Sequence, residues 1–206
     1  MKNIWIKNKA ILMAVVISIS ILIVTTVAYF TSQDIVVNTI NVGDVDIEVS
    51  EEFTPPESWD GKAYSKIVKI KNNSKSPALI RVALVPRWVD SQGNAWPGDT
   101  SIVTLNYATD NIISNQNTTP ENKWTYGDDG YYYYNTIVPT EATTVEILNS
   151  VSANIPEVLK DRYKDKTLIV DVKAEAVQAT TDAYTKTWSN IININIKNML
   201  NSLCSR

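Results

Sequence analysis

The sequence contains no histidine, and this absence removes several kinds of active site. Hydrolases that use a histidine base, zinc sites of the HExxH type and imidazole proton shuttles all require that side chain. The single cysteine, Cys204, excludes an intramolecular disulfide and a cysteine zinc cluster, and we interpret it as a bystander thiol. We therefore expect the fold to depend on its hydrophobic core or on its neighbours.

The chain also has little net charge and no basic cluster. Its 19 Lys and Arg residues against 22 Asp and Glu residues give a formal net charge of −3. A protein that neutralises nucleic-acid phosphates concentrates Lys and Arg on one surface, so we expect no nucleic-acid partner. The hydrophobic fraction of 44% is high enough for a folded core.

Without histidine, carboxylates such as Asp128, Asp129, Glu141 and Glu146 are the remaining candidates for catalysis or metal binding. Their spacing fits no zinc motif. The GDDG run at 127–130 offers oxygen atoms of the kind that calcium binds, but a solvated hairpin turn explains it more simply. We expect no enzyme activity, no cofactor and no bound metal.

The N-terminus has the three parts of an export signal. MKNIWIKNK is cationic, AILMAVVISISILIV is almost wholly apolar, and small residues follow at Thr26 and Ala28. We predict a helical signal peptide over 1–28, cleaved between Ala28 and Tyr29. The alternative is an uncleaved anchor, since residues 10–30 are about long enough to span a bilayer. Both interpretations place the remaining chain outside the cytoplasm and limit membrane contact to the leader.

Alternating apolar residues mark several later segments as half-buried strands. They are DVDIEV at 44–49, AYSKIVKIK at 63–71, LIRVALVPRWV at 79–89, TTVEILNSV at 143–151 and KTLIVDVKAEAV at 166–177. Pro86 cannot donate to a ladder, so the third strand should end, bulge or lie at an edge there. Loops rich in Gly, Pro, Asn and Asp separate the strands. The pattern predicts an all-β, antiparallel β-sandwich or jelly roll over residues 29–180.

Helical signals are few after the leader. One short helix is predicted at NIPEVLKDRYKD, where Asn154 can cap the first turn and Leu159 and Tyr163 share a face. The tail, residues 181–206, is amphipathic. Its Leu and Met content favours a helix, but the alternation of Ile and Asn over 190–197 equally fits a strand.

Aromatic residues raise a second possible function. The run YYYYN at 131–135 resembles a platform for a sugar ring, but on a strand two of its tyrosines face inward and two outward. Further aromatic surface is expected around the loops, from Trp59, Trp88, Trp96 and Trp124. A monomeric surface module that binds a glycan or a host protein is therefore the alternative function.

Several segments resemble the TasA/camelysin family of exported bacterial fibre and biofilm-matrix proteins. The leader exit TVAYFTSQD and the strand NTINVGDVDIEVSEE resemble the start of that family, with Ile40, Gly43, Val45 and Ile47 in the matching positions. IVKIKNNSKSPALIRVAL is similar to its strand pair around an Asn-Asn turn, and LIVDVKAEAVQAT is similar to its closing strand.

This resemblance implies a jelly-roll domain, a dedicated signal peptidase and self-assembly, alone or with other matrix proteins, into extracellular fibres. In such fibres an N-terminal strand of one subunit completes a sheet of the next. Cleavage here would free residues 29–42 as an arm, whose Ile35, Val37 and Ile40 could fill a groove while its backbone pairs with an open sheet edge. Alternatively, residues 30–37 pair within their own subunit or stay unpaired. The tail departs from the family pattern and could cover the edge that a donor strand needs.

Overall fold

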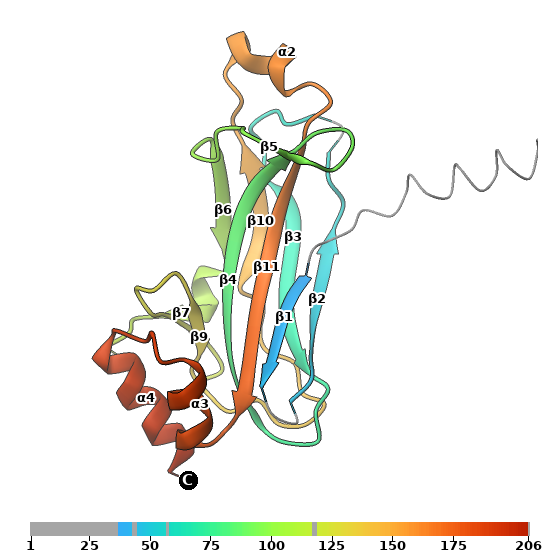
Figure 1. Cartoon of the computed structure of the whole chain (residues 1–206). Helices are drawn as coiled ribbons and strands as arrows, with labels where there is room; N and C mark the ends of the chain where they lie inside the picture. Colours follow the sequence, from blue (N-terminus) through green and yellow to red (C-terminus); the bar gives the residue numbers. More distant parts are fainter. Residues whose placement is uncertain (1–36, 43–44, 57, 117–118, 206) are drawn as a thin grey trace, which may run out of the picture. The chain divides into compact units, whose positions relative to one another are not determined.

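The computed structural model describes residues 37–42, 45–56, 58–116 and 119–205. These residues belong to one compact unit, which consists mostly of β-strands in two sheets, with few helices (Figure 1). The predicted signal peptide and its cleavage site lie outside the described residues.

The larger sheet has seven strands in the hydrogen-bonded order β1-β11-β4-β9-β8-β7, with β5 paired to β4. Its strands are β1 (Val37–Val42), β4 (Ala78–Val89), β5 (Ala95–Trp96), β7 (Ile112–Ile113), β8 (Trp124–Tyr126), β9 (Tyr132–Tyr134) and β11 (Thr167–Gln178). Most of its strand pairs are antiparallel, as predicted. However, β1 pairs with β11 and β7 pairs with β8 in parallel, so the sheet is mixed.

The smaller sheet has four antiparallel strands in the order β2-β3-β10-β6. They are β2 (Ile47–Phe53), β3 (Tyr64–Asn72), β6 (Val103–Tyr107) and β10 (Leu148–Ala153). A 3-10 turn, η1 (Thr109–Asn111), connects β6 to β7 of the larger sheet.

The inner faces of the two sheets form a common hydrophobic core, the arrangement of a β-sandwich. In β3, alternate residues face this core: Lys66, Val68 and Ile70 are buried, and Tyr64 is half-buried. Alternate residues of β4 and β11 also belong to this core: Ile80, Val82, Leu84, Leu168, Val170, Val172, Ala174 and Ala176. The period of two is therefore confirmed for these strands.

β4 does not end at Pro86. The strand pairs with β11 along its whole length. On its other side it pairs with β9 only at Arg81 and Val82, and with β5 only at Trp88 and Val89. Pro86 thus lies where one side of the strand has no ladder, which is one of the positions predicted for it.

The predicted short helix is present, as η2 (Glu157–Leu159) followed by α2 (Lys160–Tyr163). Tyr163 is buried with its ring edge-on to Trp88 and Trp96. The prediction that Asn154 caps this helix is wrong, because Pro156 precedes η2 and no side chain caps either element.

The tail forms two further helices, α3 (Thr181–Thr187) and α4 (Ile194–Cys204), so the prediction of a single short helix after the leader is wrong. The side chains of Thr180 and Asn193 accept hydrogen bonds from backbone N–H groups of the first turns and cap α3 and α4. The choice between strand and helix at 190–197 is thereby settled. The helix begins within that segment, directly after its cap.

The tail helices pack on one end of the outer face of the larger sheet, beside β9, and build a second core there (Figure 1). The sheet contributes Leu79, Ala83, Tyr131, Tyr133 and Val177, and the tail contributes Tyr184, Trp188, Ile191, Ile196, Met199, Leu200 and Leu203. Ile192, in the alternating part of the tail, is 72% exposed. Among the described residues, the tail therefore packs on a face of the larger sheet, against residues of β4, β11 and β9.

Candidate functional site

The edge strand β1 contains two of the three predicted arm residues. Val37 lies opposite Val172 of β11, and Ile40 lies opposite Glu175. Ile35 lies outside the described residues. The described part of the arm is therefore hydrogen-bonded to its own chain in this structure.

Only half of β11 has β1 beside it. β4 pairs with β11 from Thr167 to Gln178, but the β1 ladder begins at Val172. Within the part of the chain that the structure describes, residues 167–171 therefore have a strand on one side only. Their backbone N–H and C=O groups on the other side can pair with an additional extended segment.

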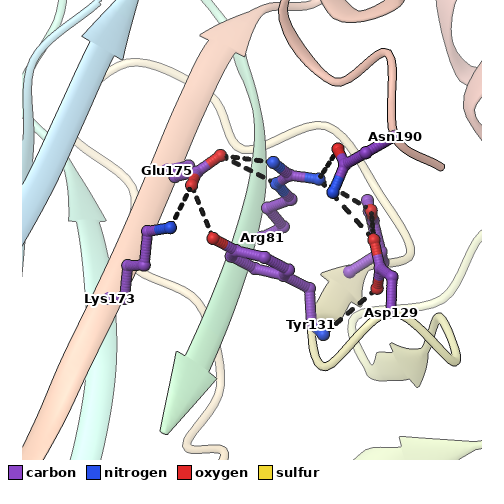
Figure 2. Close-up of polar contacts among 7 residues, drawn as sticks. Arg81, Asp129, Tyr131, Lys173, Glu175 and Asn190 are labelled. Carbon is purple, nitrogen blue, oxygen red and sulfur yellow. Dashed lines mark hydrogen bonds and ion pairs between the residues drawn. The ribbon is translucent and has the colours of Figure 1, made fainter. Parts of the chain in front are cut away.

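Next to this edge, β11 contributes to a buried charged cluster (Figure 2). Glu175 is 5% exposed and Arg81 of β4 is 4% exposed. Arg81 Nε and Nη2 donate to Glu175 Oε2 over 2.8 and 2.6 Å. Glu175 Oε1 accepts a 2.7 Å hydrogen bond from the Tyr131 hydroxyl and lies 3.3 Å from Lys173 Nζ. Both carboxylate oxygens are thus paired, as a buried charge requires.

Arg81 also connects the sheet to the tail. Its Nη1 donates to the Tyr133 hydroxyl over 3.0 Å and to Asn190 Oδ1 over 3.3 Å. The guanidinium carbon lies 4.0 Å from the centroid of the Tyr131 ring and 4.9 Å from that of Trp188. Because Trp188 and Asn190 lie between α3 and α4, this one side chain binds β11, β9 and the tail together.

The turn between β8 and β9 completes the cluster. Asp129 Oδ2 accepts a 2.7 Å hydrogen bond from the Tyr133 hydroxyl and lies 3.7 Å from Arg81 Nη1. Asp129 Oδ1 accepts from the Tyr131 N–H over 3.1 Å, and Asp128 Oδ2 accepts from Asn193 Nδ2 over 2.6 Å. Protein donors thus occupy both carboxylates of the GDDG run.

The other two acidic candidates lie apart from this turn. Glu141 forms an ion pair with Lys71 over 3.0 Å, and Glu146 forms one with Lys69 over 3.5 Å. Among the described residues, no group of three or more acidic or cysteine side chains is placed to hold a metal ion.

The pKa shifts in the cluster favour a structural role. Burial alone would raise the pKa of the Glu175 carboxyl, but hydrogen bonds from Tyr131 and Arg81 outweigh it, and the pKa lies below its usual 4.5. Burial and the hydrogen bond to Asp129 raise the pKa of the Tyr133 hydroxyl. Both shifts move away from neutral pH, whereas general acid–base catalysis requires a pKa near it.

The cluster should therefore stabilise the fold less in acid. Since the pKa of Glu175 is lower in the folded state than its ordinary 4.5, its contribution is present above pH 4.5 and is lost as the pH falls through the folded value. We expect Glu175→Gln to be less stable at neutral pH and to lose less stability on acidification. Urea unfolding of the wild type and of Glu175→Gln between about pH 6 and about pH 3 gives, for each protein, the slope of the unfolding free energy against pH. The matched variant Glu157→Gln, at an exposed carboxylate, should retain the wild-type slope; an unchanged slope in Glu175→Gln would contradict the assignment.

The predicted aromatic surface is largely inside the protein. Of the four tryptophans expected at the surface, Trp59, Trp88 and Trp124 are 9% exposed or less, and Trp96 is half-buried. In the tyrosine run, Tyr132 and Tyr134 pack in the core between the sheets, while Tyr131 and Tyr133 pack in the second core. The predicted alternation is confirmed, but the outward pair is covered by the tail and forms no open platform.

The reasoning from sequence missed Arg81 and Glu175. A signal was present, because Arg81 is the single charged residue in ALIRVAL, Glu175 is the single charged residue in AEAV, and the two charges are opposite.

Comparisons with family models, with curated proteins and with solved structures find no match for this chain. In the described part of the chain, every helix is too short or too polar to cross a membrane.

Proposed function

We propose that this chain is a non-enzymatic structural protein, secreted to the cell surface or the biofilm matrix, that assembles into extracellular fibres by donating its N-terminal strand. The observation that carries the proposal is the edge formed by β1 and the half-covered β11. The export leader and the TasA/camelysin resemblance support it. On the basis of the leader and the resemblance, the proposal has three further parts. The domain has jelly-roll topology, and a dedicated signal peptidase removes residues 1–28. The fibres consist of this protein alone or of this protein with other matrix proteins.

Assembly in this proposal is an exchange of β1 between copies. An edge strand has a single ladder, so β1 can leave β11 without breaking any other strand pair. The β11 of a neighbouring copy offers β1 the same partners in the same register, which makes the exchange nearly neutral in free energy. The residues that precede Val37 would then extend the same parallel ladder along 167–171 of the acceptor copy.

The link between β1 and β2 limits the distance between copies. The four residues 43–46 join the end of β1 to the start of β2. Fully extended, they span roughly 14 Å. Donor and acceptor domains must therefore be in direct contact, and we expect a compact fibre with closely spaced subunits.

Two single-cysteine variants test the exchange. In a Cys204→Ser background, one protein carries Val37→Cys and the other carries Val172→Cys, at positions that face each other in the β1–β11 register. When the two are mixed as chains that begin at Tyr29 and are then oxidised, we expect a disulfide-linked heterodimer on a non-reducing gel. Only pairing between different copies can form it.

The double variant Val37→Cys/Val172→Cys serves as the internal control, because it can also close within one chain. If it oxidises internally while the mixture gives no heterodimer, β1 does not exchange and the proposal is wrong. Monomers at all concentrations in sizing and electron microscopy would favour the alternative, a monomeric adhesion module for a glycan or a host protein.

A further inference from the structure

A lysine and a glutamate meet inside the β-sandwich, on neighbouring strands of the smaller sheet. Lys66 Nζ of β3 lies 2.6 Å from Glu51 Oε2 of β2, and the two side chains are 3% and 4% exposed. The strand register places Phe53 opposite Lys66, and the centroid of the Phe53 ring lies 4.6 Å from Nζ. Paired strands thus hold an amine and a carboxyl group in contact in a largely apolar interior, which raises their effective concentration toward each other.

This pair differs from the other ion pairs among the described residues. Each of the other lysines paired there has a side chain that is at least 36% exposed. Arg81 is buried with Glu175, but donors occupy both oxygens of that carboxylate, and a guanidinium keeps its proton and is not a nucleophile. In contrast, Glu51 Oε1 is buried and has no hydrogen-bond partner within the described residues. A half-satisfied buried carboxylate is costly, so the ion pair is a poor final state for these two groups.

We propose that Lys66 and Glu51 join in an isopeptide bond within the chain. A proton passes from the ammonium group to Glu51 Oε2 along their hydrogen bond, and the neutral Nζ then attacks the carboxyl carbon Cδ. The bond between Nζ and Cδ forms and the bond between Cδ and Oε2 breaks. Oε2 leaves as water, with the transferred proton and a second proton from Nζ. One ammonium and one carboxylate thus give one amide and one water, and the step needs no oxidant or co-reactant.

The amide suits this environment better than the ion pair does. It carries no charge, and Oε1 becomes a neutral carbonyl oxygen, whose burial without a donor costs less than that of a carboxylate oxygen. A lysine amine that is removed from water in a hydrophobic pocket is also activated as a nucleophile. Because the single cysteine excludes an internal disulfide, this bond would give the chain a cross-link that does not depend on redox conditions.

The bond would reinforce the strand that carries the arm. β2 is an edge strand of the smaller sheet, and the short link 43–46 joins it to β1. In the proposed fibre, tension on a donated β1 therefore reaches β2 first, and among the described strands β2 is hydrogen-bonded only to β3. A covalent bond to β3 keeps β2 from separating under that tension. This benefit rests on the proposed function, whereas the bond itself rests on the buried pair.

Mass spectrometry of the full chain, denatured after it has folded, tests the bond. We expect the wild type to be lighter than its sequence mass by one water. Lys66→Met/Glu51→Leu lacks both reacting groups and should have its full sequence mass. Removal of the leader, or loss of water elsewhere in the chain, changes both masses alike. In a proteolytic digest of the wild type, tandem mass spectrometry should find a branched peptide that joins a segment of β2 through Glu51 to a segment of β3 through Lys66.

Lys66→Arg keeps the positive charge but has no amine to acylate, so it should also have its full sequence mass. The proposal is overturned if the folded wild type has its full sequence mass, or if its digest contains no peptide branched between Lys66 and Glu51. Both results come from the wild type, so they decide the question even where a variant does not fold. The disulfide exchange between Val37→Cys and Val172→Cys chains should proceed equally in a Lys66→Met/Glu51→Leu background, and the two proposals can therefore fail independently.

Discussion

Replacing Lys66 by alanine should lower the free energy of unfolding by about 3–5 kcal/mol. Lys66 Nζ lies 2.6 Å from Glu51 Oε2 inside the sandwich, where the two side chains are 3% and 4% exposed. Within the described residues, Glu51 Oε1 has no hydrogen-bond partner. Removing the ammonium therefore leaves a buried carboxylate uncompensated. Truncation also removes the contact of Lys66 with the Phe53 ring, 4.6 Å away.

Two matched variants separate this effect from a general loss of charge. Lys69 and Glu146 form a pair at the surface over 3.5 Å, with side chains 40% and 39% exposed, and Lys69→Ala should cost less than about 1 kcal/mol. The double variant Lys66→Met/Glu51→Leu should recover most of the lost stability, because it removes both buried charges and keeps the volume. Urea unfolding measures all three. Equal losses in Lys66→Ala and Lys69→Ala would show that the buried pair has no special role.

Replacing Asn72 by alanine should cost a similar amount, about 3–5 kcal/mol, since several buried polar groups would lose their partners. Asn72 is fully buried at the end of β3. Its Nδ2 donates to the backbone oxygens of Ser76, Val138 and Pro139 over 3.0, 3.0 and 3.2 Å. Its Oδ1 accepts from the N–H of Ser74 over 3.0 Å and from the Ser74 hydroxyl. One amide thus fixes the Asn-Asn turn to the segment that precedes β10.

The adjacent residue is the natural control for this prediction. Asn73 donates to Glu48 Oε2 over 3.1 Å in an exposed hydrogen bond. Asn73→Ala should therefore cost less than about 1 kcal/mol. Thermal and urea unfolding of the two alanine variants give the difference directly. If Asn73→Ala is the more damaging substitution, the turn is stabilised by contacts other than those of Asn72.

The strand segments could be predicted because their side chains obey a period of two. In β3 that period holds even for a lysine, since Lys66 is buried in phase with Val68 and Ile70. The turn that follows β3 could also be predicted, because the apolar alternation gives way there to Asn and Ser. These signals are local, so one sequence is sufficient for them.

The second core was not predicted, because local rules conflict in the tail. Isoleucines at 192, 194 and 196 favour a strand by propensity and alternation. The structure resolves this through the cap at Asn193 and through burial of Ile196, while Ile192 and Ile194 stay exposed. A signal did exist in β4, because the run from Ala78 to Val85 is apolar except for Arg81, and such a run is typical of a strand buried on both faces.

The pairing of the arm could not be derived from the sequence for a different reason. β1 and β11 are about 130 residues apart, and period-two patterning does not specify which strand lies beside which. The same holds for Arg81 and Glu175, which face each other across strands separated by 94 positions. Charge and spacing made each residue unusual, but only the tertiary fold brought the two side chains together.

If copies join by donating β1, as proposed, a chain of subunits has two unlike ends, because the donated strand and the accepting β11 edge are different surfaces. One terminal copy has an unused arm, and the copy at the opposite terminus has an empty β11 edge, since a head-to-tail joint is not symmetric. A molecule that lacks residues 29–42 keeps its edge but has nothing to insert. Small amounts of such a molecule would stop growth at one terminus and leave the other free, so fibre length would depend on how many incomplete copies a cell exports.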